Sequence, residues 1–447
     1  MTSVTDAHEG EPLTSIEEHV ADILATIRPL APTEFSLGDA HGLVLAEDVA
    51  ASSPLPSFDN SAMDGYAVRV EDVAAASQDS PVTLPVVGEV AAGDTGAYAL
   101  PPGTSIKIMT GAMLPHGTEA VVPVEWTDGG RARVTIRAKA DFGASVRLAG
   151  GDAKAGEVLV TAGTRLHPMH IAVIAAAGRG TVLVRPRPRV VVLSTGSELA
   201  EPGTPIIPGR IWDSNSFMIA AAAREAGALA YRQAIVPDHP EQVLPAIEDQ
   251  LARADLMITT GGVSMGGEHD VVKAALRQLG TIEFRKVAMQ PGMPQGFGTV
   301  ALPASAVEGR PRGGLLSRLA DRGEVAETPV REGEHDRVPI FTLPGNPVSA
   351  YVSFQIFVRP ALGALQAYGG LGLETVKAEL TGHLRSPPGR RSFLRGVLDR
   401  AAGRVAPLTG QESHQVATLG KANALIVAPE WAVTMAAGET ADVLVLP

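Results

Sequence analysis

The chain contains no cysteine among its 447 residues. This absence excludes disulfides, thiolate nucleophiles and cysteine-ligated zinc or iron. Long apolar runs are also missing: the stretch from Ile171 to Leu183 is interrupted by Gly178 and Arg179 and is shorter than the roughly 20 residues of a membrane span. The N-terminus is acidic and lacks the basic start and apolar core of a secretory signal. We therefore expect a cytoplasmic protein without a membrane span.

Positive charge is scarce as well. The 37 Lys and Arg residues are outnumbered by 49 Asp and Glu residues, which gives a net charge of -12. Because such a surface repels phosphate backbones, nucleic acid is not an expected partner. An anionic small molecule must then be bound by local cations and helix N-termini rather than by the overall field. The 45% apolar fraction and the length predict a folded chain of two to four domains.

The spacing of apolar residues changes along the chain. Thr14 and Ser15 each precede a Glu by three residues and start a helical pattern that reaches Ile27. Residues 53–151 then carry short alternating runs between Gly and Pro turns, which predicts a β-rich module. Its expected strands are Thr83–Val90, Ser105–Met109, Ala120–Val124 and Arg133–Ile136. From about residue 370 onward short strands return, which predicts a C-terminal β-barrel or sandwich.

Between these two parts, residues 186–366 alternate strands with helices, which predicts an α/β domain with a parallel, doubly wound sheet. Its expected strands are Val190–Leu193, Leu229–Val236, Leu256–Thr259, Ile282–Val287 and Phe341–Leu343. A helix is expected to follow Asp238, with Asp238 and Glu241 forming a capping box around Pro240. The charged, Gly- and Pro-rich stretch 303–338 is predicted to be a mobile surface insertion.

Segments rich in Gly, Ser and Pro follow the expected strands of this α/β domain. They are Ser194–Leu199, Pro237–His239, Thr260–Gly266, Gln290–Pro294 and Leu343–Pro347. Because open parallel sheets bind ligands at the carboxyl ends of their strands, five such segments on one edge indicate a binding site. Any one of them alone is explained equally well as a tight loop. Pro347 starts a long apolar helix, and the free N–H groups at a helix start suit an anion.

The same edge carries Glu198, Asp238 and Asp270. Hard carboxylate oxygens suit magnesium, so these side chains are candidate ligands for a Mg²⁺ ion shared with substrate phosphates. Each of them is also explicable as a helix cap, and Asp238 most readily, because of its spacing to Glu241.

The β-rich module has its own unusual segments. Ser57–Tyr66 places several polar side chains close together before a strand, and Ile108–Ala112 contains Thr110. Asp64–Gly65 alone is a common turn pair, but the preceding run of residues 60–63 is less natural for a turn. Arg147 and Asp152 pair a cation with a carboxylate around Gly150 and Gly151, which in isolation would be a surface loop.

Taken together, the segments FDNSAMDGYAV, IMTGA, STGSEL, TGGVSMG and LPGNPVS closely resemble, in this order, the molybdopterin molybdenumtransferases and the C-terminal domain of gephyrin. The resemblance covers about residues 40 to 415. It implies an elongated subunit of four domains and a homodimer. The implied boundaries are 37–55 with 153–185 for a discontinuous linker domain, 56–152 for the β-rich domain, 10–36 with 186–366 for a molybdopterin-binding-like α/β domain, and 367–447 for a C-terminal β-barrel.

The family's reaction inserts molybdate into adenylylated molybdopterin, uses magnesium to cleave the phosphoanhydride and releases AMP. The resemblance places the active site between the α/β domain of one subunit and the β-rich domain of the other. It implies catalytic roles for Asp64, Thr110, Glu198, Asp238 and Asp270, of which Glu198, Asp238 and Asp270 would hold the metal. The implied substrate-binding residues are Asp59, Ser61, Arg147, Asp152, Ser194, Gly261, Gly262, Ser264, Lys286, Pro344, Gly345, Asn346, Pro347, Ser349, Arg395 and Ser413. Arg395 and Ser413 are expected to contribute to the oxyanion site for molybdate.

The chain departs from the family where the family typically reads Lys-Pro-Gly-Lys-Pro. Here the segment is Gln290-Pro-Gly-Met-Pro294, so two cations expected near molybdate are absent. Losing two charge-assisted contacts of roughly 1.5–3 kcal/mol each would weaken oxyanion binding by orders of magnitude unless Lys286 or Arg285 replaces them. An alternative is therefore a gephyrin-like dimeric scaffold with weakened or absent catalysis, which binds a membrane-receptor or cytoskeletal protein in a groove near its C-terminal domain.

Overall fold

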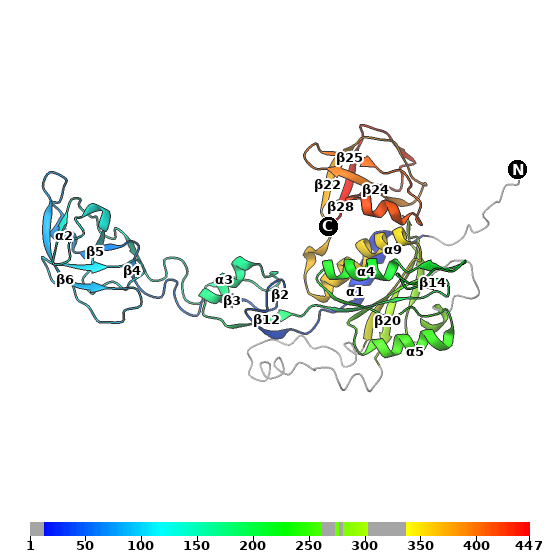
Figure 1. Ribbon diagram of the computed structural model, residues 1–447, viewed down its shortest axis with the longest axis horizontal. Helices are drawn as coiled ribbons and strands as arrows, with labels where there is room; N and C mark the ends of the chain where they lie inside the picture. The colour runs from blue at the N-terminus through cyan, green and yellow to red at the C-terminus, as the bar shows by residue number, and fades with distance from the viewer. Residues whose placement is uncertain (1–12, 262–272, 277–279, 303–336) are drawn as a thin grey trace, which may run out of the picture. The chain divides into compact units, whose positions relative to one another are not determined.

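A computed structural model describes residues 13–261, 273–276, 280–302 and 337–447 (Figure 1). The chain divides into two compact units. The β-rich unit comprises Phe35–His41 and Glu47–Val182, and the α/β unit comprises Met1–Glu34, Gly42–Ala46 and Leu183–Pro447. The predicted insertion at 303–338 lies almost wholly outside the described residues, as do the predicted site residues Gly262, Ser264 and Asp270.

The β-rich unit is built on a five-stranded sheet in the order β8-β5-β7-β6-β9. Its strands are β5 (Gly65–Val68), β6 (Val82–Val90), β7 (Ser105–Ile108), β8 (Ala120–Pro123) and β9 (Arg133–Ile136), so the four strands predicted for this module are confirmed. Tyr66 and Val68 face one small core and Ala67 faces another, as the alternation along a strand requires. At Gly65 a Cβ atom would lie 2.0 Å from the Val122 carbonyl oxygen, so the sheet admits only glycine there.

Short elements complete this part of the chain. Strand β4 (Asn60–Ser61) pairs with β10 (Val146–Arg147), and β3 (Val49–Ala50) pairs with β11 (Val158–Val160). Helices α2 (Val70–Val73) and α3 (Pro168–Ala176) lie between strands. A separate three-stranded sheet joins β1 (Thr33–Ser36), β12 (Thr181–Arg185) and β2 (Val44–Leu45). The β4–β10 pair brings two of the unusual sequence segments together.

The α/β unit contains a six-stranded sheet in the order β16-β13-β17-β21-β20-β18. Strands β13 (Arg189–Ser194), β16 (Leu229–Arg232), β17 (Leu256–Thr260) and β21 (Arg337–Leu343) are parallel. The expectation of a parallel sheet is wrong at one strand. Strand β20 (Pro294–Ala301) runs antiparallel to both of its neighbours, β21 and β18 (Glu283–Lys286), whereas β18 itself runs in the direction of the parallel strands. The sequence analysis predicted no strand at the position of β20, whose Gly296 and Gly298 are unusual within a strand. At Gly298 a Cβ atom would lie 2.2 Å from the Thr281 carbonyl oxygen, so the strand needs glycine.

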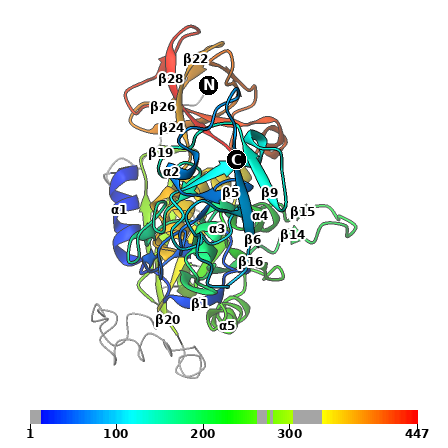
Figure 2. The same cartoon turned by 90° about the vertical axis from the view of Figure 1, so that its left-hand side faces the viewer.

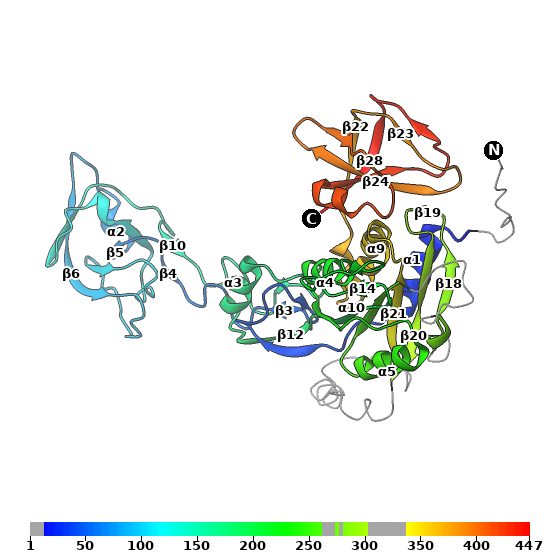
Figure 3. The same cartoon turned by 45° about the vertical axis from the view of Figure 1, so that its right-hand side comes forward.

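Helices cover both faces of this sheet, which confirms the doubly wound architecture (Figures 1 and 3). Val190 and Val192 point into a core shared with α1 (Ile16–Thr26), α4 (Asn215–Glu225), α9 (Pro347–Ser353) and α10 (Arg359–Leu365). Val191 and Leu193 point the other way, into a core shared with α5 (Pro240–Leu251) and residues 275–276. Because side chains alternate along a strand, β13 contributes residues to the core on each face of the sheet.

Two predicted helix starts had different outcomes. Ser15 is the N-cap of α1 and its hydroxyl accepts a hydrogen bond from the Glu18 amide at 3.1 Å, which confirms the predicted cap. The predicted capping box of Asp238 is wrong: α5 begins at Pro240 with His239 at the N-cap, and no side-chain capping bond is formed. Capping therefore no longer explains Asp238.

The C-terminal part of the α/β unit is a closed barrel (Figure 2). Strands β24 (Arg391–Asp399), β25 (Arg404–Pro407), β22 (Thr375–Leu380), β28 (Thr440–Val445) and β26 (Ala424–Ala428) pair in this order, and β26 pairs back with β24. This five-stranded closure confirms the predicted β-barrel. A sixth strand, β19 (Met289–Gln290), pairs in parallel with β24. It connects the barrel to the segment Gln290–Pro294, where the family has two lysines.

The helix Pro347–Leu365 is apolar and long enough, by length and composition, to cross a membrane. It runs through α9, the π-turn η3 (Phe354–Val358) and α10. Most of it is buried, and Val348, Val352 and Phe357 pack into the core above the sheet. It is therefore the core helix of a soluble protein.

Candidate functional site

The segments that follow the parallel strands lie together at the carboxyl edge of the sheet. The Thr195 amide donates to the Thr260 carbonyl at 3.2 Å, and the Gly261 amide donates to the Leu343 carbonyl at 3.2 Å. Gly261 has a φ of +95°, and a Cβ atom there would lie 2.7 Å from the Thr195 carbonyl oxygen. Small residues are thus required for these loops to approach one another, as the sequence suggested.

A buried carboxylate, Asp213, lies directly beneath this edge. It is 1% exposed and accepts hydrogen bonds from the Ser194 hydroxyl at 3.0 Å and from the Ser216 amide at 3.1 Å. The Ser216 hydroxyl also donates to it. Arg232 lies 3.6 Å from the same carboxylate and stacks over the Phe217 ring. Ser194, a predicted substrate-binding residue, is fully buried, so its hydroxyl is committed to this network.

The start of α9 meets a loop of the barrel. Asn346 is the N-cap of α9, and its side-chain amide donates to the Ser413 hydroxyl at 2.9 Å. The Val348 amide donates to the Ser413 carbonyl at 3.1 Å, and the Asn215 side chain donates to the Gly345 carbonyl at 2.6 Å. The structure therefore brings together Gly345, Asn346, Pro347 and Ser413, which come from two separate predicted segments. Pro344 and Ser349 lie beside them and are buried.

Arg395 of strand β24 supports this loop. It is 1% exposed, and its guanidinium donates to the carbonyls of Gly410 and Glu412 while its Nε has no hydrogen-bond partner. Burial lowers the pKa of Arg395 below its usual value. An unpartnered buried donor is costly, so the Nε atom is poised to bind an acceptor.

The predicted metal ligands are only partly described. Glu198 is exposed, Asp238 is half-buried, and the Asp238 amide donates to the Ser197 hydroxyl at 3.3 Å, so their segments are neighbours. Within the described ranges, no three His, Asp or Glu side chains are grouped for a metal, and Asp270 lies outside those ranges. Magnesium commonly takes one or two protein carboxylates together with substrate phosphates and water. Glu198 and Asp238 supply carboxylates of this kind on neighbouring segments.

In the β-rich unit, Asp64 and Thr110 form a second group. One carboxylate oxygen of Asp64 accepts from the Thr110 amide at 2.7 Å and from the Thr110 hydroxyl at 2.9 Å. These two donors lower the pKa of Asp64 below its ordinary value. The exposed Asp64 is therefore held as a carboxylate with one oxygen facing solvent.

The other predicted residues of this unit belong to the segments just before Asp64 and to the segment 147–152. Asp59 accepts from the Ala149 amide at 2.7 Å, and Arg147 pairs with Asn60 between β10 and β4. Ser61 is fully buried and donates to the Met63 carbonyl at 2.6 Å. Arg147 and Asp152 are exposed. Ser61 thus shapes the loop, while Asp59, Arg147 and Asp152 surround it.

The segment Gln290–Pro294, where the family has two lysines, lies between the sheet and the barrel. Gln290 is exposed and pairs through its backbone with Ser392 of β24, and Met293 is half-buried. Arg285 forms ion pairs with Asp22 and Glu283, which raise the pKa of its guanidinium. Because both carboxylates already hold it, Arg285 is not a replacement for the absent cations. Lys286 is half-buried at the end of β18.

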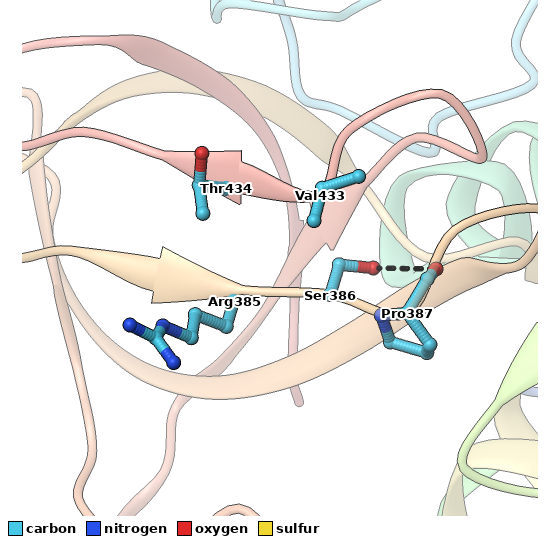
Figure 4. Close-up of a pocket in the computed structure, with 5 residues that line it drawn as sticks. All are labelled: Arg385, Ser386, Pro387, Val433 and Thr434. Carbon is cyan, nitrogen blue, oxygen red and sulfur yellow. Dashed lines mark hydrogen bonds between the residues drawn. The ribbon is translucent and has the colours of Figure 1, made fainter.

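A surface pocket of about 360 Å³ lies beside the antiparallel strands β23 (Leu384–Arg385) and β27 (Thr434–Met435), which form a sheet separate from the barrel (Figure 4). It is lined by Arg385, Ser386, Pro387, Val433 and Thr434. The Ser386 hydroxyl contacts the Ser392 hydroxyl at 2.8 Å and the Pro387 carbonyl at 3.5 Å. None of the predicted site residues lines it, so this pocket is separate from the strand edge described above.

Sequence reasoning missed Asp213 and Asn215. Both belong to the segment Trp212-Asp-Ser-Asn215, which joins strand β15 (Ile211–Trp212) to helix α4. Strand β15 pairs in parallel with β14 (Leu199–Ala200). The available signal was a run of capping residues before an apolar helix. It gave no indication that the aspartate is buried beneath the ends of β13 and β17.

Three family models match successive parts of the chain. The MoeA N-terminal region (domain I and II) matches residues 14–178, a probable molybdopterin binding domain matches residues 191–364, and the MoeA C-terminal region (domain IV) matches residues 377–446.

Similar proteins match almost the whole length. Molybdopterin molybdenumtransferase 2 of Mycobacterium tuberculosis is 42% identical over 95% of this chain and 97% of its own. Molybdopterin molybdenumtransferase 1 of the same organism is 36% identical over 97% of this chain and 99% of its own. The crystal structure of a molybdopterin biosynthesis MoeA protein from Pyrococcus horikoshii superimposes with a TM-score of 0.78 at 28% identity, covering 97% of this chain and 99% of that one.

Proposed function

Because this chain belongs to the MoeA family of molybdopterin molybdenumtransferases, we propose that it inserts molybdate into adenylylated molybdopterin with release of AMP. It is an enzyme of molybdenum cofactor biosynthesis. The observation that carries the finer proposal is the Asp64–Thr110 pair, because an exposed carboxylate held ionised by two donors suits metal or water positioning at a phosphoanhydride.

The two substrates suit different parts of the site. The strand edge with Gly261, Gly345 and Asn346 offers backbone close enough for the nucleotide and pterin to lie against it. Molybdate is an oxyanion, and the start of α9, the Ser413 hydroxyl and the unpartnered Nε of Arg395 offer donors to it. Glu198 and Asp238 would hold Mg²⁺, which supplies charge neutralisation at the phosphates when bound.

In the proposed reaction, hydrolysis of the phosphoanhydride consumes one water and gives AMP and molybdopterin, which keeps its own terminal phosphate. Molybdate then forms two Mo–S bonds to the dithiolene, and the two thiol protons leave with one oxide as water. No redox partner is needed. The sulfur ligands come from the pterin, so the absence of cysteine from the chain is compatible with this chemistry.

The chain acts, we propose, as a cytoplasmic homodimer of four-domain subunits with the boundaries given above. The β-rich residues of one subunit act with the α/β residues of its partner. Large apolar side chains beside Asp64 support this arrangement, since Phe58, Met63, Met109 and Met113 are 39–42% exposed. Exposed apolar groups of this kind mark surfaces that another protein covers.

The test is AMP release by purified protein from adenylylated molybdopterin with Mg²⁺, with and without molybdate. Molybdate-dependent release that Asp64→Asn abolishes supports the proposal. No release from folded protein contradicts it and favours the gephyrin-like scaffold, whose partner would then be sought at the barrel.

A further inference from the structure

The buried network around Asp213 serves no substrate contact described so far. The Ser194 hydroxyl donates its single proton to an Asp213 oxygen. The 2.9 Å contact between the Ser194 and Thr260 hydroxyls must then be a bond that Thr260 donates. Asp213 thereby fixes the direction of both hydroxyls. Ser194 and Thr260 are the last residues of β13 and β17, where the strand edge begins.

The same aspartate also holds the parallel strand pair β14–β15 that follows Glu198. Its amide donates to the Ala200 carbonyl at 2.9 Å, and the Ile211 amide donates to the Glu198 carbonyl at 2.9 Å. Arg232, which faces the Asp213 carboxylate, reaches Glu201, the residue after β14, at 3.1 Å. One buried side chain therefore connects the ends of two strands, the start of α4 and the strand pair next to a predicted metal ligand.

Stability alone is a weak explanation for this arrangement. Burying an ion pair costs desolvation energy, and well-packed apolar residues often replace such pairs without loss of stability. We propose that Asp213 is a positioning residue: through Ser194, Thr260 and Arg232 it holds the nucleotide-binding edge and Glu198 in their working geometry. This inference rests on the proposed function.

The chain offers a matched control at the opposite edge of the same two strands. Arg189, the first residue of β13, donates to Asp255 just before β17, with Nε–Oδ2 at 3.0 Å and Nη2–Oδ1 at 2.8 Å. The Asp255 side chain is 9% exposed, so it is also a largely buried aspartate paired with an arginine. It lies at the amino ends of the strands, away from the loops that carry the site.

The experiment compares Asp213→Asn, Asp255→Asn and Ser194→Ala in the full-length protein. For each, kcat and KM for AMP release, the dissociation constant for AMP and the melting temperature are measured. We expect Asp213→Asn and Ser194→Ala to lower kcat/KM by about tenfold or more and to weaken AMP binding. Asp255→Asn should lower the melting temperature yet leave kcat/KM within about twofold of wild type. In the double variant, kcat/KM should be little lower than in Ser194→Ala alone, because Asp213 and Ser194 act as a unit.

Wild-type kcat/KM in folded Asp213→Asn, or equal losses in Asp213→Asn and Asp255→Asn, overturns the inference. If Asp213→Asn does not fold, Ser194→Ala decides: tenfold loss supports a positioning role, and wild-type activity rejects it. A wild-type protein without molybdate-dependent AMP release instead rejects the proposed function, and AMP binding by the same three variants still tests the positioning role.

Discussion

At the scale of single residues, the chemistry depends on how donors are placed around a few carboxylates and oxyanion sites. Asp64 is exposed, and its lowered pKa comes mainly from the amide and hydroxyl of Thr110, with a smaller contribution from the positive charge of Lys107. A substitution can remove the hydrogen bond from the Thr110 hydroxyl, and with it that part of the lowering of the Asp64 pKa. Thr110 is therefore the residue through which the protonation of Asp64 can be tested.

We predict that Thr110→Val moves the acidic limb of the kcat/KM profile to higher pH. Removing the hydroxyl donor lets the pKa of Asp64 rise toward its ordinary value, so activity is lost at a higher pH as the solution is acidified. Thr110→Ser keeps the donor and should retain the wild-type profile. A profile that is unchanged in Thr110→Val would show that Asp64 does not set the acidic limb.

A second prediction concerns Gln290, which stands where the family has a cation. We expect Gln290→Lys to lower the KM for molybdate by about tenfold, because a charge-assisted contact to an oxyanion contributes roughly 1.5 kcal/mol or more. Gln290→Glu should raise it, since a like charge repels molybdate. The measurement is AMP release as a function of molybdate concentration. Equal KM values for the two variants would place Gln290 away from molybdate.

At the scale of elements, helix α1 depends on a buried histidine. His19 is 3% exposed, packs edge-on against Phe357 of η3 and has a pKa lowered from 6.5 to about 4, mainly by burial and also by the nearby Arg285. It is therefore neutral in the folded protein at neutral pH. Protonation would place an unsolvated charge between α1 and the core helix.

We predict that acid weakens the packing of α1 through His19. Its pKa is lower in the folded than in the unfolded chain, so its contribution is fully present above pH 6.5 and is lost as the pH falls toward 4. The difference corresponds to roughly 3 kcal/mol of unfolding free energy. Calorimetry between pH 7 and pH 4 should show a smaller fall in melting temperature for His19→Leu than for wild type. Parallel curves for the two proteins would contradict the prediction.

Much of the fold could be predicted because local patterns agree with it. The Ser15 cap, the apolar strand β13 and the strands of the β-rich unit were all predicted from the sequence. The failures have physical causes. Strand β20 needs glycine where its backbone meets Thr281 closely, which looks like a loop in sequence. Asp238 has the spacing of a cap, but the helix starts one residue later, at the proline.

The candidate site was less predictable, because its motifs identify segments but not contacts. The pairing of Asn346 with Ser413 joins residues 67 positions apart, and no local pattern indicates it. Asp213 acts from beneath the strand edge, so its role depends on burial that only the folded chain creates. The sequence indicated that Arg285 might replace a missing cation, whereas the structure pairs it with two carboxylates.

At the scale of the whole molecule, the proposed homodimer predicts complementation between two inactive chains. Asp64→Asn disables the β-rich residues and Glu198→Ala disables the α/β residues. If each site combines the two subunits, a heterodimer contains one intact site, so co-refolded chains should recover about a quarter of wild-type activity. Sites built within one chain would recover none, and sedimentation of the mixture confirms that dimers have formed.

The central claim, molybdenum insertion, is tested most directly by counting both products of one reaction. Adenylylated molybdopterin, molybdate and Mg²⁺ are incubated with the protein, and AMP and dithiolene-bound molybdenum are quantified in the same sample. The account predicts that both accumulate in equal amounts and that neither forms with Asp64→Asn. AMP without bound molybdenum, or neither product from folded wild-type protein, would contradict it.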